Sequence, residues 1–215
     1  MPAFDILLLG FTHSTSEPCT TASAFLVMPL AFDIETEGLD KLVDDITVAS
    51  VFDPDRDIKK TFFFTRCPVE RKNSILLFLQ ELDDAKELYC FNGIRFDIPF
   101  IVHRFEVPES RYRQWILKTF DYFEICKCVF ASSCSLNKLL SVNGHSVKTS
   151  SGLQAVIWAK EANWKELDDY CMQDTILTHV ISRQKRVIIP LTNRQHVGCI
   201  SHMERDAHRV LFFHY

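Results

Sequence analysis

The sequence predicts one α/β domain in which a mixed central β-sheet is covered by helices. The composition of its 215 residues, 47% hydrophobic and 24% charged, fits a soluble globular domain with a sizeable core. The order of the periodic segments gives the class: three strand-like runs come first, strands and helices then alternate, and helical patterns follow.

Each expected element rests on a local pattern. Apolar or alternating runs bounded by turn residues predict strands over residues 24–33, 46–52, 60–65, 88–91 and 115–120. Apolar residues at helical spacing predict helices over residues 69–84, 96–105, 121–131, 136–142, 153–160 and 164–186. We divide the chain into an N-terminal extension (1–23), the α/β domain (24–188) and a basic, His-rich tail (189–215). The tail is expected to be either a further helix or a loose appendage.

Charge and glycine content exclude several classes of function. The 24 Lys and Arg against 28 Asp and Glu give a net charge of −4, which argues against a basic surface that grips long duplex DNA. With only 6 Gly there is neither a Walker A loop nor a dinucleotide fingerprint. A nucleic-acid substrate would therefore be held mainly at one local site.

The eight cysteines are scattered, which is typical of a reducing compartment. No Lys or Arg precedes Lys41, so the start of the chain lacks the positive segment of a secretory signal or a mitochondrial presequence. No apolar run is long enough to span a membrane. We expect a soluble intracellular protein of the cytoplasm or nucleus.

An apolar run at residues 31–39 carries two acids, Asp33 and Glu35. Side chains at i and i+2 of a strand point to the same face, so two carboxylates would lie together there. Like charges this close repel each other unless a cation joins them. The alternative is a strand that runs out into an acidic turn.

Two further segments each place an acid where it could join this pair. Asp97 follows the turn residues Asn92-Gly93 at a helix start, where it could equally be a helix cap with Pro99 in the first turn. Asp174 follows Tyr170 by four residues, so the two share a helix face. The alternative there is a half-buried Tyr beside a solvated Asp.

Taken together, three segments resemble the exonuclease motifs of the DEDD superfamily in order and spacing: Asp33-Ile34-Glu35-Thr36, Phe91-Asn92-Gly93-Ile94-Arg95-Phe96-Asp97-Ile98-Pro99, and Tyr170-x-x-x-Asp174. Tyr four residues before the last Asp marks the tyrosine subtype, whereas the other subtype has His five residues before it. The second segment is most similar to the proofreading domains of family B DNA polymerases and their stand-alone relatives. The resemblance covers about residues 24–188.

The resemblance implies an RNase H-like fold with a five-stranded mixed sheet. It also implies a 3′–5′ exonuclease that uses two divalent ions, Mg²⁺ or Mn²⁺, to release nucleoside 5′-monophosphates from single-stranded DNA. Carboxylates suit these hard ions. In this pattern Asp33 bridges both metals, Glu35 and Asp174 hold the metal that carries the attacking water, and Asp97 anchors the second. Tyr170 positions that water with Glu35, because a phenol with a pKa of about 10 is a poor base at neutral pH.

The same resemblance assigns contacts with the terminal nucleotides to Thr36, Asn92 and Phe96. Phe96 could stack on a base or simply pack in the core. The expected partner is the 3′ end of a single-stranded nucleic acid, DNA rather than RNA, and no membrane. Because no polymerase motifs follow, the chain would act alone or beside a separate polymerase or other replication or repair protein. The oligomeric state stays open.

Rival interpretations remain at this point. One is the same chemistry on RNA, and another is a non-catalytic module that binds nucleic acid or protein on the same fold. Two soft-metal sites are also conceivable, one at Cys126, Cys128 and Cys134 and one at His196, Cys199 and His202. The first lacks a second ligand pair at zinc-finger spacing.

Overall fold

The computed structural model describes residues 29–64, 67–130, 133–147, 152–190 and 197–201. The expectations for the N-terminal extension, for a strand beginning at residue 24 and for the last residues of the tail therefore lie outside the described residues. Of the expected strand at 24–33, the part from Pro29 onward is present.

The centre of the fold is a five-stranded mixed sheet with strand order β3-β2-β1-β4-β5. Its strands are β1 (Pro29–Thr36), β2 (Ile46–Asp53), β3 (Ile58–Phe63), β4 (Glu87–Cys90) and β5 (Thr119–Asp121). The first three strands form an antiparallel meander, while β4 and β5 run parallel to β1. The predicted five-stranded mixed sheet is confirmed.

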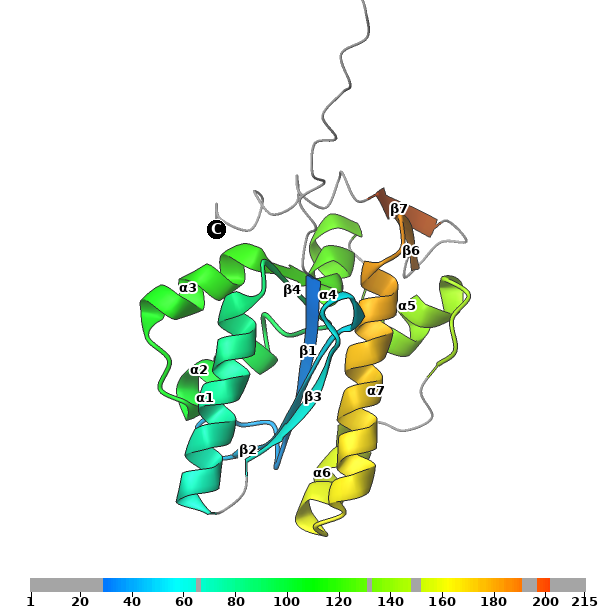
Figure 1. The fold of residues 1–215 in the computed structure, drawn as a ribbon. Coiled ribbons are helices and arrows are strands. Elements are labelled where there is room, and N and C mark those ends of the chain that lie inside the picture. The colour runs from blue at the N-terminus through cyan, green and yellow to red at the C-terminus, as the bar shows by residue number, and fades with distance from the viewer. Residues whose placement is uncertain (1–28, 65–66, 131–132, 148–151, 191–196, 202–215) are drawn as a thin grey trace, which may run out of the picture.

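Helices cover both faces of this sheet (Figure 1). On one face lie α1 (Pro68–Asp84), α2 (Asp97–Arg104) and α3 (Glu109–Lys118), which share a hydrophobic core with the sheet. On the other face lie α5 (Leu136–Val142), α6 (Gly152–Lys160) and α7 (Trp164–Ser182). Three short helical segments connect these elements: η1 (Pro54–Arg56), α4 (Tyr122–Glu124) and a π-helical turn, η2 (Ile125–Val129).

The alternation of side chains along β1 decides which face receives the acids. Leu30, Phe32 and Ile34 are buried in the core that contains α1, α2 and α3. The intervening residues therefore point to the opposite face, which α7 covers. There the Ser50 hydroxyl of β2 donates a hydrogen bond to the Cys171 carbonyl (3.0 Å) and also contacts the Thr175 hydroxyl. These buried contacts fix α7 against the strands that carry the acids.

Of the strand expected over residues 115–120, only the last two residues lie in a strand. Residues 115–118 end helix α3, and β5 consists of the three residues Thr119–Asp121. The side chain of Trp115 is buried, and its indole N–H donates a hydrogen bond to Asp83 at the end of α1 (2.8 Å). The only polar atom of this side chain therefore has a partner while Trp115 lies in α3. The expected helix over 121–131 is likewise split into α4 and η2.

The chain after α7 also differs from expectation. The helix ends at Ser182 rather than continuing to 186, and β6 (Arg186–Pro190) pairs antiparallel with β7 (Val197–Ser201). The expected domain boundary at 188 therefore falls within a strand. Where a helix or a loose appendage was expected, the described residues form a two-stranded sheet.

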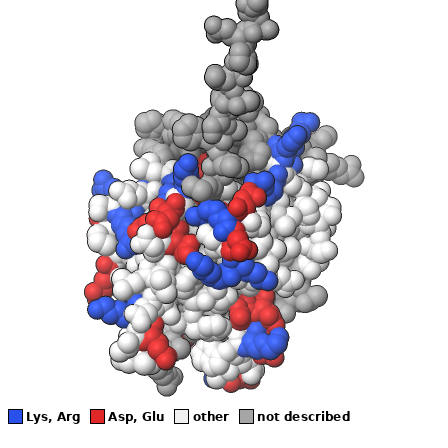
Figure 2. All heavy atoms as spheres, viewed as in Figure 1, with Lys and Arg blue, Asp and Glu red and all other residues white. Residues whose placement is uncertain are grey.

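The surface agrees with the balanced composition. On the face seen in Figure 2, Lys and Arg side chains are interspersed with Asp and Glu. Ion pairs such as Lys60–Glu81 (2.5 Å) and Arg183–Asp55 (3.0 Å) join groups of opposite sign. None of the helices in the described part of the chain is long and apolar enough to cross a membrane.

Candidate active site

Asp33 and Glu35 lie on one face of β1, as the i, i+2 spacing predicts. A carboxylate oxygen from each lies within 4.8 Å of the other and of the Cys171 sulfur on α7. Glu35 is largely buried, with 9% of its surface exposed. The two acids therefore lie at the sheet–helix boundary rather than in a solvated turn.

The turn between β4 and α2 needs the two residues found there. Asn92 has a φ of 68°, in the left-handed region that Asn tolerates better than most residues. A Cβ on Gly93 would lie only 2.6 Å from the sulfur of Cys90. The Asn-Gly pair thus lets the chain turn sharply and start α2 beside the end of β1.

Asp97 is the first residue of α2 and is buried against β1. Its Oδ1 accepts a hydrogen bond from the Ile34 main-chain N–H (3.1 Å), which lies between Asp33 and Glu35 in sequence. Burial raises the pKa of Asp97 to about 7; the bond from Ile34 acts in the opposite direction, and nearby Asp121 and Asp174 add to the increase. The helix-cap interpretation does not describe this residue, because the cap position is Phe96 and the Asp97 carboxylate bonds to a strand.

Tyr170 and Asp174 lie one turn apart on α7, and both are buried. The Tyr170 ring also packs edge-to-face on Trp158 of α6, with ring centroids 5.9 Å apart. Burial raises the pKa of Tyr170 well above its usual value, and the negative charges of Asp174, Glu35 and Asp33 add to this. The phenol therefore stays protonated, and the alternative of a solvated Asp174 is wrong.

One cavity of about 640 Å³ brings the predicted residues together. Its lining includes Asp33, Glu35, Asp97, Tyr170, Asp174, Asn92 and Phe96. Phe96 also packs against Phe100 (ring centroids 4.8 Å apart), so it serves the core as well as the cavity. Thr36 is buried and its hydroxyl donates to the Gly38 carbonyl; its contact with substrate stays a prediction.

Sequence reasoning missed Asp121, at the end of β5. Its carboxylate accepts hydrogen bonds from the main-chain N–H groups of Asn92 (2.8 Å) and Ile94 (2.9 Å), and from those of Phe123 and Glu124. It thereby holds the turn that precedes Asp97. Burial raises its pKa to about 6 despite these bonds. The available signal was the Phe120-Asp121 pair at the end of β5. It was missed because the strand was expected over 115–120, which placed Asp121 at the start of a helix.

The donor set fits hard divalent cations. Four carboxylates line one cavity, and the raised pKa of Asp97 reflects its burial, to which the charges of Asp121 and Asp174 add. Cys171 lies beside the acids, but burial raises its pKa far above normal and its thiol donates to the Asp33 carbonyl (3.6 Å). Hard ions such as Mg²⁺ and Mn²⁺ prefer oxygen to sulfur, so the carboxylates are the better-suited donors.

The soft-metal alternatives receive no support from the described residues. The sulfurs of Cys126 and Cys134 are 3.4 Å apart, but the Cys128 thiol donates to a Glu124 carboxylate oxygen (3.4 Å). Within the described chain, these three cysteines do not form a cluster with metal-ligand geometry. His196, His202 and the side chain of Cys199 lie outside the described residues.

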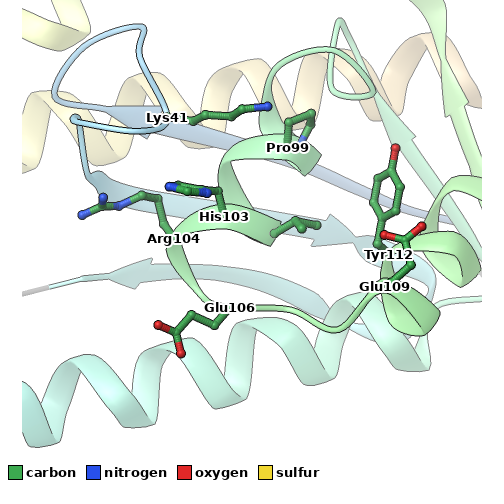
Figure 3. A pocket seen from close by; sticks show the side chains of 8 residues that line it. Lys41, Pro99, His103, Arg104, Glu106, Glu109 and Tyr112 are labelled. Atoms are coloured by element: carbon green, nitrogen blue, oxygen red, sulfur yellow. The ribbon is translucent and has the colours of Figure 1, made fainter.

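A second cavity, of about 800 Å³, lies beside α2 and α3 (Figure 3). Side chains of both signs line it: Lys41 and Arg104 on one hand, and Glu106 and Glu109 on the other. Arg104 pairs with Asp45 (3.3 Å). This mixture gives no preference for a polyanion, and the predicted acids line the other cavity.

Comparison with solved structures finds the same fold in a DNA polymerase and in a protein described as a nuclease. A family B DNA polymerase from the archaeon Pyrobaculum calidifontis matches with a TM-score of 0.57 and 18% identity, over 70% of this chain but only 23% of the polymerase chain. The apo form of the nuclease matches with a TM-score of 0.52 and 21% identity, over 71% of this chain and 68% of that one. Because the sequence identities are low, these structural matches show a shared fold and nothing finer.

The curated protein sequences compared with this chain contain no match. A sequence model of the RNase H superfamily matches residues 30–183, a range that holds the central sheet from Leu30 onward and all of α7. The match spans well over half of the sequence. The chain therefore belongs to the RNase H superfamily.

Proposed function

We propose that this chain is a metal-dependent 3′–5′ exonuclease of the DEDD superfamily, tyrosine subtype, that degrades single-stranded DNA. The observation that carries the proposal is the meeting of three distant segments. Acids from β1, from the start of α2 and from α7 line one cavity together with Tyr170. A fold alone has no physical need for four carboxylates at this place, because their mutual repulsion opposes folding.

The acids would hold two divalent ions, Mg²⁺ or Mn²⁺. Asp33 would serve both ions, Glu35 and Asp174 would hold one of them, and Asp97 would hold the other. Ions bound in this way supply positive charge that activates a water and stabilises the oxygens of the phosphodiester as the bond breaks. The chain's own part is to orient the donors, and the bond from Ile34 to Asp97 fixes one acid relative to the other two on β1.

Tyr170 would position the attacking water as a hydrogen-bonding group. Its raised pKa excludes general-base action near neutral pH, because the phenol keeps its proton. Glu35, whose charge contributes to that shift, lines the same cavity and would share the same water. The products would be nucleoside 5′-monophosphates.

The remaining wall of the cavity suits a terminal nucleotide. Phe91 and Phe123 line it and pack edge-to-face on each other, with ring centroids 5.8 Å apart, and Phe96 lines it from α2. Aromatic faces stack on any base and so tolerate sequence variation. Asn92 adds an amide at the turn. The preference for DNA over RNA rests on the likeness of the motifs to those of polymerase proofreading domains.

The test uses single-stranded DNA and RNA oligomers of equal sequence, labelled at the 5′ end, with Mg²⁺ or Mn²⁺ and with a chelator. The wild-type protein should shorten the DNA stepwise from its 3′ end only when metal is present. Asp33→Asn should abolish this while leaving thermal unfolding nearly unchanged. The matched control is Asp57→Asn, an exposed acid at a left-handed position (φ 55°) that Asn tolerates.

Three results would count against the proposal. Immediate release of a labelled mononucleotide would indicate attack from the 5′ end. Equal or faster loss of the RNA would overturn the preference for DNA. Wild-type protein that is as inert as Asp33→Asn on every oligomer would leave the non-catalytic module as the better interpretation.

A further inference from the structure

Two thiols contact each other in the wall of the candidate active site. The sulfurs of Cys126, in the π-helical turn η2, and Cys134, just before α5, are 3.4 Å apart. Cys126 is completely buried, while Cys134 keeps 8% of its surface exposed and lines the same cavity as the acids. One member of the pair can therefore be reached from the cavity, and the other lies directly behind it.

The two thiols differ in a way that suits sequential oxidation. The Cys134 thiol donates a hydrogen bond to the Cys126 sulfur when both are protonated, and the bond that Cys126 can return to an ionised Cys134 lowers the pKa of Cys134. A reachable thiol of lowered pKa beside a second thiol is the usual arrangement of redox-sensitive pairs. Cys90 and Cys171 differ: burial raises the pKa of each well above normal.

Cys134 is continuous with residues that shape the cavity. Ser133, Ser135 and Asn137 line it on either side of Cys134 along the chain. Ser135 caps α5 by accepting a hydrogen bond from the Lys138 N–H (3.2 Å). A movement of the Cys134 sulfur toward Cys126 therefore changes the lining of the cavity.

We propose that Cys126 and Cys134 are an oxidation site that closes reversibly into a disulfide and thereby lowers the activity of the neighbouring site. The oxidant is a peroxide. The Cys134 thiolate attacks one peroxide oxygen and becomes a sulfenic acid, while the other oxygen leaves as water after protonation. The Cys126 sulfur then attacks the Cys134 sulfur, releasing a second water and forming the S–S bond. A thiol reductant returns both thiols.

The structural consequence follows from the geometry of the bond. A disulfide brings its sulfurs to about 2.0 Å, so the pair must approach by more than about 1 Å. This moves the Cys134 side chain, which lines the cavity, toward η2 and so changes the wall that would receive the terminal nucleotide. The loss of activity rests on the proposed exonuclease function, whereas the cross-link itself does not.

Peptide mapping tests the cross-link without any assay of activity. The full chain is treated with hydrogen peroxide in the presence of a chelator, free thiols are alkylated, and the protein is digested with trypsin. Trypsin cleaves after Lys118, Lys127 and Lys138. Cys126 therefore lies in the peptide 119–127, and Cys128 and Cys134 lie together in the peptide 128–138. We expect these two peptides to be joined after oxidation and separated by reductant.

Variants assign the bond and its effect. The joined peptides should persist in Cys128→Ser, the matched control in the same segment, and disappear in both Cys134→Ser and Cys126→Ala. Oxidised wild type and oxidised Cys128→Ser should lose at least about tenfold in exonuclease rate, as a displaced cavity wall misaligns the scissile bond. Reductant should restore the rate, and the rate of Cys134→Ser, whatever its value, should be the same before and after peroxide.

The outcomes separate the two proposals. Oxidation of the exposed Cys67 and Cys128 without joined peptides would overturn the oxidation site, whatever the activity. Joined peptides with an unchanged exonuclease rate would overturn its regulatory role. A wild-type protein that forms the bond yet never degrades an oligomer in its reduced form would support the oxidation site and contradict the exonuclease instead.

Discussion

At the scale of a single residue, the role we propose for Tyr170 is to position a water rather than to take its proton. Its phenol is buried near three carboxylates and holds its proton, so its contribution would be a hydrogen bond to water. Tyr170→Phe keeps the ring and its contact with Trp158 but removes that bond. We expect the single-turnover rate to fall about 10- to 100-fold, in the range of one positioned catalytic hydrogen bond, with substrate affinity unchanged.

The control for this substitution is Tyr112→Phe, which removes a hydroxyl from the second cavity. That variant should degrade oligomers at the wild-type rate. A Tyr170→Phe enzyme of undiminished rate would show that the phenol does not orient the water.

Asp121 has a structural role that the sequence did not reveal. Both of its oxygens accept main-chain N–H bonds, and those from Asn92 and Ile94 hold the turn before Asp97. Asp121→Asn replaces one acceptor by a donor that faces an N–H group. We expect a loss of about 1–3 kcal/mol in the free energy of unfolding, measured by urea denaturation.

The same variant should also have a lower exonuclease rate, because its turn no longer fixes Asp97. Asp121→Asn with wild-type stability would contradict the role we assign to these bonds. Sequence spacing could identify Asp97, whose neighbours resemble a motif. It could not identify Asp121, whose importance depends on β4 and β5 lying side by side.

At the scale of elements, the turn between β4 and α2 has no space for an added side chain at Gly93. A Cβ on Gly93 would lie 2.6 Å and 2.7 Å from the Cys90 side chain, inside buried packing. Gly93→Ala should therefore cost about 1–3 kcal/mol of stability, as overpacking in a core does, and displace the start of α2. Thermal unfolding and the exonuclease rate would both report it.

The matched control is Gly152→Ala at the start of α6. Nothing lies within 4 Å of the Cβ that it would add, so we expect its stability to stay at or slightly above the wild-type value. If Gly93→Ala proved as harmless as Gly152→Ala, the close approach of the turn to Cys90 could not be what fixes α2.

Elements with a clear local pattern could be predicted from sequence, whereas the bounds of three-residue β5 could not. The alternating apolar run of β1 gave both the strand and the shared face of its two acids, which the structure confirms. The strand expected over 115–120 is wrong up to residue 118, because Trp115 belongs to a helix that packs on α1. Three-residue β5 has too few side chains for any period, and its pairing with β4 is decided by tertiary contacts.

For the whole molecule, the acids make stability depend on pH in an unusual direction. The folded-state pKa of Asp97 is about 7 and that of Asp121 about 6, both above the ordinary value for Asp. Such groups contribute most to stability below pH 4, and this contribution is lost as the pH rises through the folded-state pKa. Other groups have the opposite sign, as the lowered pKa of Asp83 shows, so a single titration curve is not decisive.

The comparison of two variants isolates this contribution. In a chelator, Asp97→Asn should gain stability relative to wild type as the pH rises from about 4 to 7, by at most about 1.4 kcal/mol per pH unit. Asp57→Asn should follow wild type throughout. Urea denaturation at several pH values measures both. If the difference in unfolding free energy between wild type and Asp97→Asn does not change with pH, Asp97 is already ionised in the metal-free protein.

The central claim is that acids from three separate segments converge to bind divalent ions, and diffraction from crystals soaked in Mn²⁺ tests it most directly. We predict two anomalous peaks in the cavity about 4 Å apart, each about 2 Å from carboxylate oxygens of Asp33, Glu35, Asp97 or Asp174. Crystals of Asp33→Asn should lose at least one of them. A wild-type cavity without anomalous density, at Mn²⁺ concentrations that occupy other acidic sites of the same crystal, would contradict the account.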